Sequence, residues 1–206
     1  MQTTGKFTTA QTAAMLGWSV DRLNRTRKIL IPAATGKSAG KATPRIYDYR
    51  DLRFLILAKK LDKILTPDGQ QRVFKCIKSM KVTDQTLFVA DVPIDLGPVD
   101  DELQSAIRKL EDVGKGIVET GGDAFFEGTD ISVYRVAALK SAQTLDEILE
   151  DYPSLTRAQV ERAVAFSKAS PKRGKPYPGV SLKRALSHLA ELGAFDADEG
   201  DAEAGR

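Results

Sequence analysis

Apolar residues recur at helical spacing over most of the chain, and the first 65 residues give the clearest pattern. A first short helix is expected to end at Gly17, which is suited to a helix C-terminus. Ser19 can cap a second helix, in which Val20 and Leu23 share an inward face. The sequence therefore predicts two short helices joined by a tight turn.

A basic loop follows the second predicted helix. Residues 29–31 are apolar, residues 33–44 are small, polar and basic, and residues 45–47 are suited to a strand. The loop and its flanks predict a β-hairpin wing. Asp48 can then cap a long helix with one buried stripe. Residues 1–65 are therefore predicted to form a winged helix-turn-helix domain.

The rest of the chain is predicted to be mainly helical with small β elements. Residues 66–115 are expected to form connecting or dimerisation helices and a strand at 87–92 that Pro93 ends. Residues 116–168 predict a β-hairpin followed by a short helical bundle. Residues 169–206 comprise a basic, proline-rich linker, an amphipathic helix and an acidic tail. The predicted fold class is mainly α with small β elements.

Charge divides the chain more sharply than its net value of +3 suggests. Residues 1–63 contain 13 basic and four acidic side chains, a balance of +9, so the remainder has a balance of −6. Such asymmetry indicates that the first part binds a polyanion and that the second part meets a different partner. For a helix-turn-helix, the polyanion is expected to be DNA.

Enzyme, metal and cofactor sites find little support in the residues. His188 is the only histidine and Cys76 the only cysteine, so a metal site or a Cys/His dyad lacks partners. The segment Thr35-Gly-Lys-Ser38 resembles a phosphate-binding loop, but the pattern requires glycine at position 31, which is isoleucine. We therefore expect no catalysis, no metal and no cofactor.

Localisation follows from composition. No segment approaches the roughly 20 apolar residues that a membrane span needs, and no N-terminal apolar run resembles a signal peptide. A single cysteine also suits a reducing compartment. We expect a cytoplasmic protein with no membrane partner.

The second predicted helix and the basic loop carry the candidate DNA-binding residues. Arginine can fork onto guanine and asparagine onto adenine in the major groove, so base-edge contacts are predicted for Arg22, Asn24 and Arg25. Phosphate contacts are predicted for Lys28, Lys37, Lys41 and Arg45. Because helix-turn-helix proteins gain specificity by pairing half-sites, a homodimer on an inverted repeat of operator DNA is expected.

Residues 7 to about 63 resemble the DNA-binding head of the MerR superfamily. Phe7, Ala13, Leu16-Gly17 and Ser19 follow the first-helix and turn pattern of that family, and Arg45-Ile-Tyr-Asp-Tyr-Arg-Asp-Leu52 follows its exit from the wing into the third helix. The chain departs from the family by lacking the usual aromatic pair and the glycine before the wing, where it has Thr26-Arg27-Lys28-Ile29.

Residues from about 116 to 167 resemble a small antitoxin-type domain, formerly catalogued as a domain of unknown function, that is found beside PIN-like ribonuclease toxins. The resemblance is carried by Glu127-Gly-Thr-Asp-Ile-Ser-Val-Tyr134 and, more specifically, by Thr144-Leu-Asp-Glu-Ile-Leu-Glu-Asp-Tyr-Pro-Ser-Leu-Thr156. Asp130 stands where that family usually has arginine. The resemblance implies a VapB-like antitoxin that binds its own promoter and neutralises a VapC-like toxin.

Candidate toxin-binding residues lie in the C-terminal segment. Basic side chains can enter the acidic metal site expected of a PIN-like nuclease, and an aromatic residue can anchor them; the candidates are Lys172, Arg173, Lys175 and Tyr177. A groove-binding helix face is formed by Leu182, Leu186 and Leu189. The alternative is a solubilising linker and a helix that folds back on its own core.

The preferred hypothesis is a DNA-binding antitoxin of a type II toxin–antitoxin module that autoregulates its operon and forms a hetero-oligomer with its toxin. A MerR-like transcriptional regulator that responds to a small effector is the alternative. A third possibility, an architectural DNA-binding protein, predicts no sequence preference. The first two classes are separated by what binds the second half of the chain, a toxin or a small effector.

Overall fold

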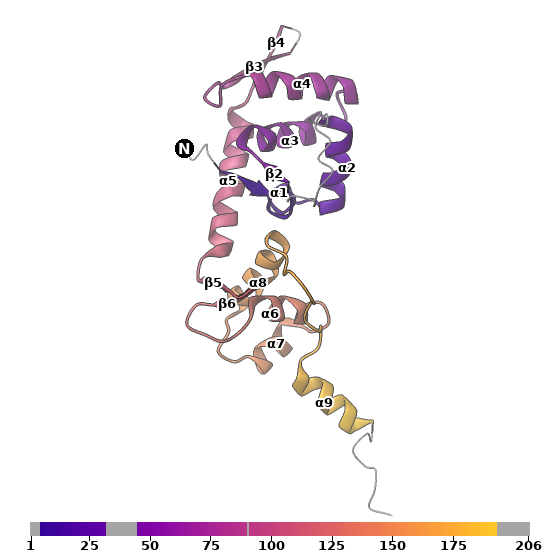
Figure 1. Ribbon diagram of the computed structural model, residues 1–206, viewed down its shortest axis with the longest axis vertical. Helices are drawn as coiled ribbons and strands as arrows, with labels where there is room; N and C mark the ends of the chain where they lie inside the picture. Colours follow the sequence, from indigo (N-terminus) through magenta and orange to yellow (C-terminus); the bar gives the residue numbers. More distant parts are fainter. Residues whose placement is uncertain (1–4, 32–44, 90, 193–206) are drawn as a thin grey trace, which may run out of the picture. The chain divides into compact units, whose positions relative to one another are not determined.

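The computed structural model describes residues 5–31, 45–89 and 91–192 (Figure 1). The chain divides into two compact units, residues 1–115 with 168–171 and residues 116–167 with 172–206. The described residues are mainly helical, and their strands form two-stranded antiparallel sheets. The predicted class, mainly α with small β elements, is therefore confirmed.

The first unit begins with two helices, α1 (Thr9–Leu16) and α2 (Val20–Leu30), separated by residues 17–19. Gly17 ends α1 in the left-handed region, at a φ of 65°, where a side chain would be strained. Ser19 caps α2 by accepting a 3.1 Å hydrogen bond from the Arg22 backbone N–H. The predicted pair of helices and its capping residues are present.

The buried face of α2 differs from the prediction. Leu23 and Leu30, seven residues apart, are buried, whereas Val20 is exposed. Residues at this spacing return to the same side of a helix after two turns, so α2 packs on the core from Leu23 to its C-terminal end. Arg27 and Lys28 also lie in its last turn, where positive charge favours a helix C-terminus.

The arms of the predicted wing are not those of the structure. Residues 29 and 30 belong to α2, and β2 (Ile46–Tyr47) pairs with β1 (Phe7–Thr8) instead. The burial of Leu30 against the core outweighs the strand preference of the apolar run. The predicted hairpin with arms at 29–31 and 45–47 is therefore wrong, while the loop itself, with Lys37 and Lys41, lies outside the described residues.

Helices α3 (Tyr49–Leu61) and α4 (Pro67–Ser79) brace this pair. Asp48 caps α3 and exchanges hydrogen bonds with Asp51, so the predicted cap is confirmed. Lys78 of α4 pairs with both carboxylates, at 2.9 Å from Asp48 and 2.7 Å from Asp51. Charge pairing therefore joins the start of α3 to the end of α4.

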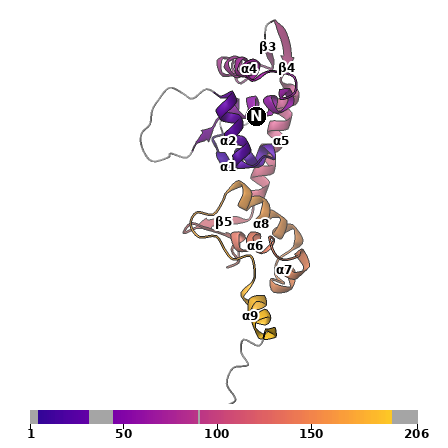
Figure 2. The same cartoon turned by 90° about the vertical axis from the view of Figure 1, so that its right-hand side faces the viewer.

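A hairpin of β3 (Thr86–Val89) and β4 (Val92–Asp95) follows α4 and lies beside it (Figure 2). Pro93 lies within β4, opposite Phe88, so the expectation that this proline ends a strand at 87–92 is wrong. The chain reverses at Asp91, whose φ is 63°. Proline is compatible with a strand edge that has no neighbour, and β4 is such an edge in this two-stranded sheet.

A buried ion pair joins α3 to α5 (Gly97–Gly114). Both Nε and Nη2 of Arg53 donate to the carboxylate of Asp100, with 2.7 Å between Nε and Oδ1. The Tyr49 hydroxyl donates to the same Oδ1 at 3.3 Å, and Gln104 Nε2 donates to that hydroxyl at 3.4 Å. Arg53 and Asp100 are both buried, so their charges depend on each other.

The second unit combines a hairpin with short helices. Its elements are β5 (Ile117–Thr120), β6 (Asp123–Phe126), α6 (Val133–Leu139), α7 (Leu145–Asp151), α8 (Arg157–Ala169) and α9 (Leu182–Glu191). Thr144 caps α7 in a capping box with Glu147, and Thr156 and Gln159 exchange the corresponding bonds before α8. Fully buried side chains from several elements form its core: Ala124, Val136, Leu139, Ile148 and Val160. The hairpin and helices expected here are present.

Replacing Arg53 tests the importance of the buried pair. Arg53→Met leaves the Asp100 carboxylate buried without its partner and is expected to lower the free energy of unfolding by about 3–5 kcal/mol in chemical denaturation. Lys60→Met removes an exposed pair between the same helices, with Glu102, and is expected to cost at most about 1 kcal/mol. Similar losses in both variants would contradict this role.

Candidate functional site

The exposed side of α2 carries unpaired positive charge. Arg22, Arg25 and Lys28 are exposed, as is Arg45 just before β2. Within the described part of the chain none of these four side chains forms an ion pair. Asp21 is also exposed in the first turn of α2, but the cations outnumber it, so this side of the helix has a positive potential that attracts polyanions.

Helix geometry orders these residues around α2. With about 3.6 residues per turn, Arg25 and Lys28 lie opposite the buried Leu23, while Arg22 and Asn24 lie on the two flanks. Asn24 is half-buried and therefore less accessible than the arginines. Because α2 continues to Leu30, all four predicted residues lie on one helix.

Trp18 supports Arg22 from the connection between α1 and α2. The guanidinium carbon of Arg22 lies 4.7 Å from the centroid of the indole ring. Trp18 itself packs against the core of the first unit, so the ring is a fixed platform. Cation–π attraction thus restricts the Arg22 side chain at the first turn of α2 without neutralising its charge.

The structure adds a residue that the sequence did not indicate. Ile29 lies on the outward side of α2, and 55% of its side chain surface is exposed. Its assignment to a strand hid this position, because only the helical register places it near Arg25. Lys37 and Lys41 lie outside the described residues, so the structure does not place them relative to α2.

The basic linker of the second unit is pinned to the hairpin. The Tyr177 hydroxyl and the Ser132 hydroxyl, at 2.8 Å, both donate to the carboxylate of Asp123. Lys172 lies 3.8 Å from the same carboxylate and 5.3 Å from the centroid of the Tyr177 ring. Partial burial acts to raise the pKa of Asp123, but the hydrogen bonds from Tyr177 and Ser132 outweigh it and lower the pKa.

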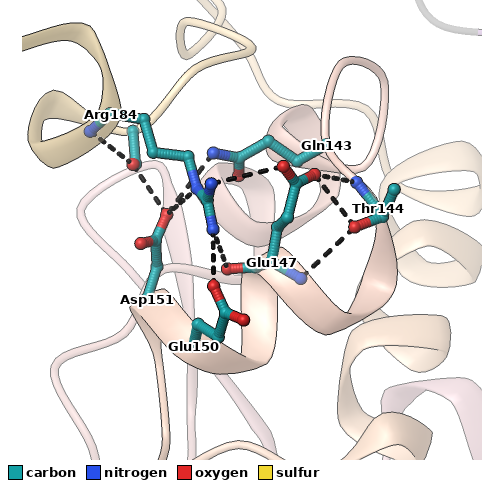
Figure 3. A network of polar contacts seen from close by, with 7 residues as sticks. Gln143, Thr144, Glu147, Glu150, Asp151 and Arg184 are labelled. Atoms are coloured by element: carbon teal, nitrogen blue, oxygen red, sulfur yellow. Dashed lines mark hydrogen bonds and ion pairs between the residues drawn. The ribbon is translucent and has the colours of Figure 1, made fainter. Parts of the chain in front are cut away.

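Arg184 fixes α9 to the acidic face of α7 (Figure 3). Its guanidinium lies 3.2 Å from Glu147, 2.9 Å from Glu150 and 3.3 Å from Asp151. The hydroxyl of Ser181, which caps α9, donates to the same Asp151 carboxylate at 2.7 Å. The start of α9 is therefore held at several points, as Figure 3 shows.

Two carboxylates of this network, Glu147 and Asp151, have a pKa below the ordinary value. The backbone N–H and the hydroxyl of Thr144 lower the pKa of Glu147. Partial burial raises the pKa of Asp151, but Ser181 and Arg184 outweigh that effect, so it too is lowered. Their contribution to stability is therefore complete above the ordinary carboxyl pKa of about 4 and is lost only as the pH falls through the lowered values.

The opposite side of α9 presents leucines to solvent. Leu182, Leu186 and Leu189 are 66%, 46% and 44% exposed. Their spacing of four and three residues places them in one stripe, turned away from Arg184. Of the other predicted toxin-binding residues, Arg173 and Lys175 are exposed, whereas Lys172 and Tyr177 contact Asp123.

Among the described residues, no group of three or more His, Cys, Asp or Glu side chains is arranged to hold a metal ion. No helix in this part of the chain is long and apolar enough to cross a membrane.

Arg184→Ala tests whether the network around Arg184 orders α9. The variant is expected to speed amide hydrogen exchange in residues 182–191 about tenfold, because the guanidinium pairs with three acids of α7. Arg157→Ala is the matched control, because Arg157 of α8 also pairs with an acid of α7, Asp146, but does not belong to the network that holds α9. Unchanged exchange in α9 of the Arg184 variant would show that other contacts hold this helix.

Comparison with known proteins identifies one region. Residues 120–167, which run from the end of β5 into α8, match the family described as "Protein of unknown function (DUF433)". This match confirms the part of the resemblance that concerns a domain of unknown function. No curated protein and no solved structure matches the chain.

Proposed function

We propose that the protein is a DNA-binding antitoxin that represses its own operon and neutralises a PIN-like ribonuclease toxin. The first unit would bind operator DNA through α1 and α2, acting as a MerR-like helix-turn-helix, and the second unit would bind the toxin. The observation that carries the proposal is the exposed, unpaired basic side of α2. A repressor and its toxin-binding function would then reside on separate units of one chain.

The DNA-binding half of this proposal rests on the chemistry of α2. An α-helix fits the major groove, and the outward Arg25 can donate two parallel hydrogen bonds to guanine. Lys28 and Arg45, both exposed, would meet phosphates, which fix orientation without recognising sequence. Arg22, held by Trp18, enters the groove with fewer rotamers to lose, which lowers the entropic cost of binding.

Dimerisation is part of the same proposal. One helix of this length contacts only a few base pairs, and two-fold pairing of half-sites about 34 Å apart is the usual way to extend the contact. The expected operator is therefore an inverted repeat, bound by a homodimer.

The toxin-binding half rests on the second unit. The exposed leucine stripe of α9 is the kind of surface that enters an apolar groove, because an amphipathic helix buries its apolar side on binding. Arg173 and Lys175 remain free to meet acidic side chains at a nuclease site. The match of residues 120–167 to the family of unknown function is consistent with the antitoxin-type resemblance of this region.

Arg25→Ala tests base recognition. The variant is expected to bind its selected operator about 1–3 kcal/mol more weakly than the parent protein in fluorescence anisotropy, with a smaller loss on random DNA. Arg108→Ala, which removes an exposed arginine from α5, should leave operator binding almost unchanged. Equal losses by Arg25→Ala on operator and random DNA would reject the base contact.

Leu186→Asp tests the leucine stripe. Placing a charge in a buried apolar interface is expected to weaken binding of the PIN-like toxin by at least about 30-fold, equivalent to about 2 kcal/mol, in titration calorimetry. Val118→Asp changes an exposed apolar residue of β5 in the same unit and serves as the control. Full toxin binding by Leu186→Asp, with operator binding intact, would show that α9 is not the docking surface.

A further inference from the structure

An exposed isoleucine interrupts the cations of α2. Ile29 follows Arg25 by four residues and Lys28 by one, yet its side chain is 55% exposed. Burying such a side chain is worth about 1.5–3 kcal/mol, and most of that stabilisation is not realised in the free protein. The position therefore has an apolar contact to gain from a ligand.

The register of α2 aligns Ile29 with the two outward arginines. Arg22, Arg25 and Ile29 are separated by three and four residues, the spacing of one line along a helix. The rise of 1.5 Å per residue puts about 10 Å between the first and the last of them. This length corresponds to about three base-pair steps at 3.4 Å each.

The backbone at Ile29 is fixed although the residue is near the end of α2. Gln71 of α4 donates from Nε2 to the carbonyl oxygen of Ile29 at 2.7 Å. The next residue, Leu30, is buried in the core. These two anchors hold the last turn of α2 in its helical register, so the exposed side chain keeps its place in the line.

The chemical surroundings select the kind of ligand. Arg25 and Lys28 flank Ile29 with unpaired positive charge, which suits a polyanion and not an apolar protein surface. The major groove offers one apolar feature on base edges, the C5-methyl group of thymine. An isoleucine beside arginines can therefore select an A·T pair through the thymine methyl group, whereas arginine selects guanine.

We infer that Ile29 is a specificity-determining residue that contacts a thymine C5-methyl group about three base pairs from the base contacted by Arg22. This inference rests on the proposed DNA-binding function. It also changes the set of residues expected to contact base edges. These are now Arg22, Arg25 and Ile29, because Asn24 lies on a half-buried flank of α2.

Uracil substitution isolates the methyl group. The full chain would first be used to select its operator from random DNA, and each thymine of one half-site would then be replaced by uracil, which lacks only that methyl. At one position the replacement is expected to weaken binding of the parent protein about fourfold, because burying one methyl-sized group is worth about 0.8 kcal/mol. Ile29→Ala should show a similar loss on the thymine operator and no further loss on the uracil operator.

Two other variants complete the test. Ile29→Leu restores bulk and is expected to recover part of the methyl dependence, whereas Ile64→Ala removes an isoleucine that is 72% exposed outside α2 and should behave as the parent protein. If the parent binds its operator but Ile29→Ala keeps the full methyl dependence, the inference is wrong and the proposed function stands. If no DNA is selected at all, both fail.

Discussion

The buried pair of Arg53 and Asp100 is the interaction on which the first unit depends. It lies between α3 and α5, and both side chains are buried. Each charge offsets the free-energy cost of removing the other from water. Tyr49 and Gln104 extend the pair into a network that fixes the two helices in register as well as in proximity. Helix α1 packs against both of these helices, and α2 packs on α1 and α4. The exposed side of α2 is therefore displayed by a frame whose centre is ionic, not purely apolar.

A second ionic arrangement organises the other unit, with a different result. Arg184 and Ser181 bind acids of α7 and so hold the start of α9. Tyr177 and Lys172 of the linker both contact the carboxylate of Asp123. The proline-rich segment is thus tied at both ends, which the composition of the linker did not indicate. Neither of the two sequence-based alternatives describes it fully: the linker folds back, while the leucine stripe of α9 stays exposed.

Local signals in the sequence predicted most helices. The features that were not predicted depend on contacts between residues far apart in the sequence. Capping residues such as Asp48 and Thr144 act over three positions, so their effect can be recognised without a fold. Asp100 has the same local appearance as a helix-start acid, yet its partner is 47 residues away. Ile29 was expected in a strand because the packing of Leu30 and the bond from Gln71 could not be known.

Ion pairing makes the difference in unpaired positive charge between the two units larger than the sequence alone indicates. Described cations of the second unit such as Lys172, Arg157 and Arg184 lie against acids of their own unit, whereas those on the outer side of α2 have no such partner. Paired charges cancel at a distance of a few ångströms beyond their separation, but unpaired ones act over about 8–10 Å at physiological salt. A polyanion is therefore attracted to α2 more strongly than the net charge of the chain implies.

The second unit uses cations such as Arg184 to order α9. A partner that buries the leucine stripe therefore meets a helix that is already formed, and less conformational entropy is lost on binding.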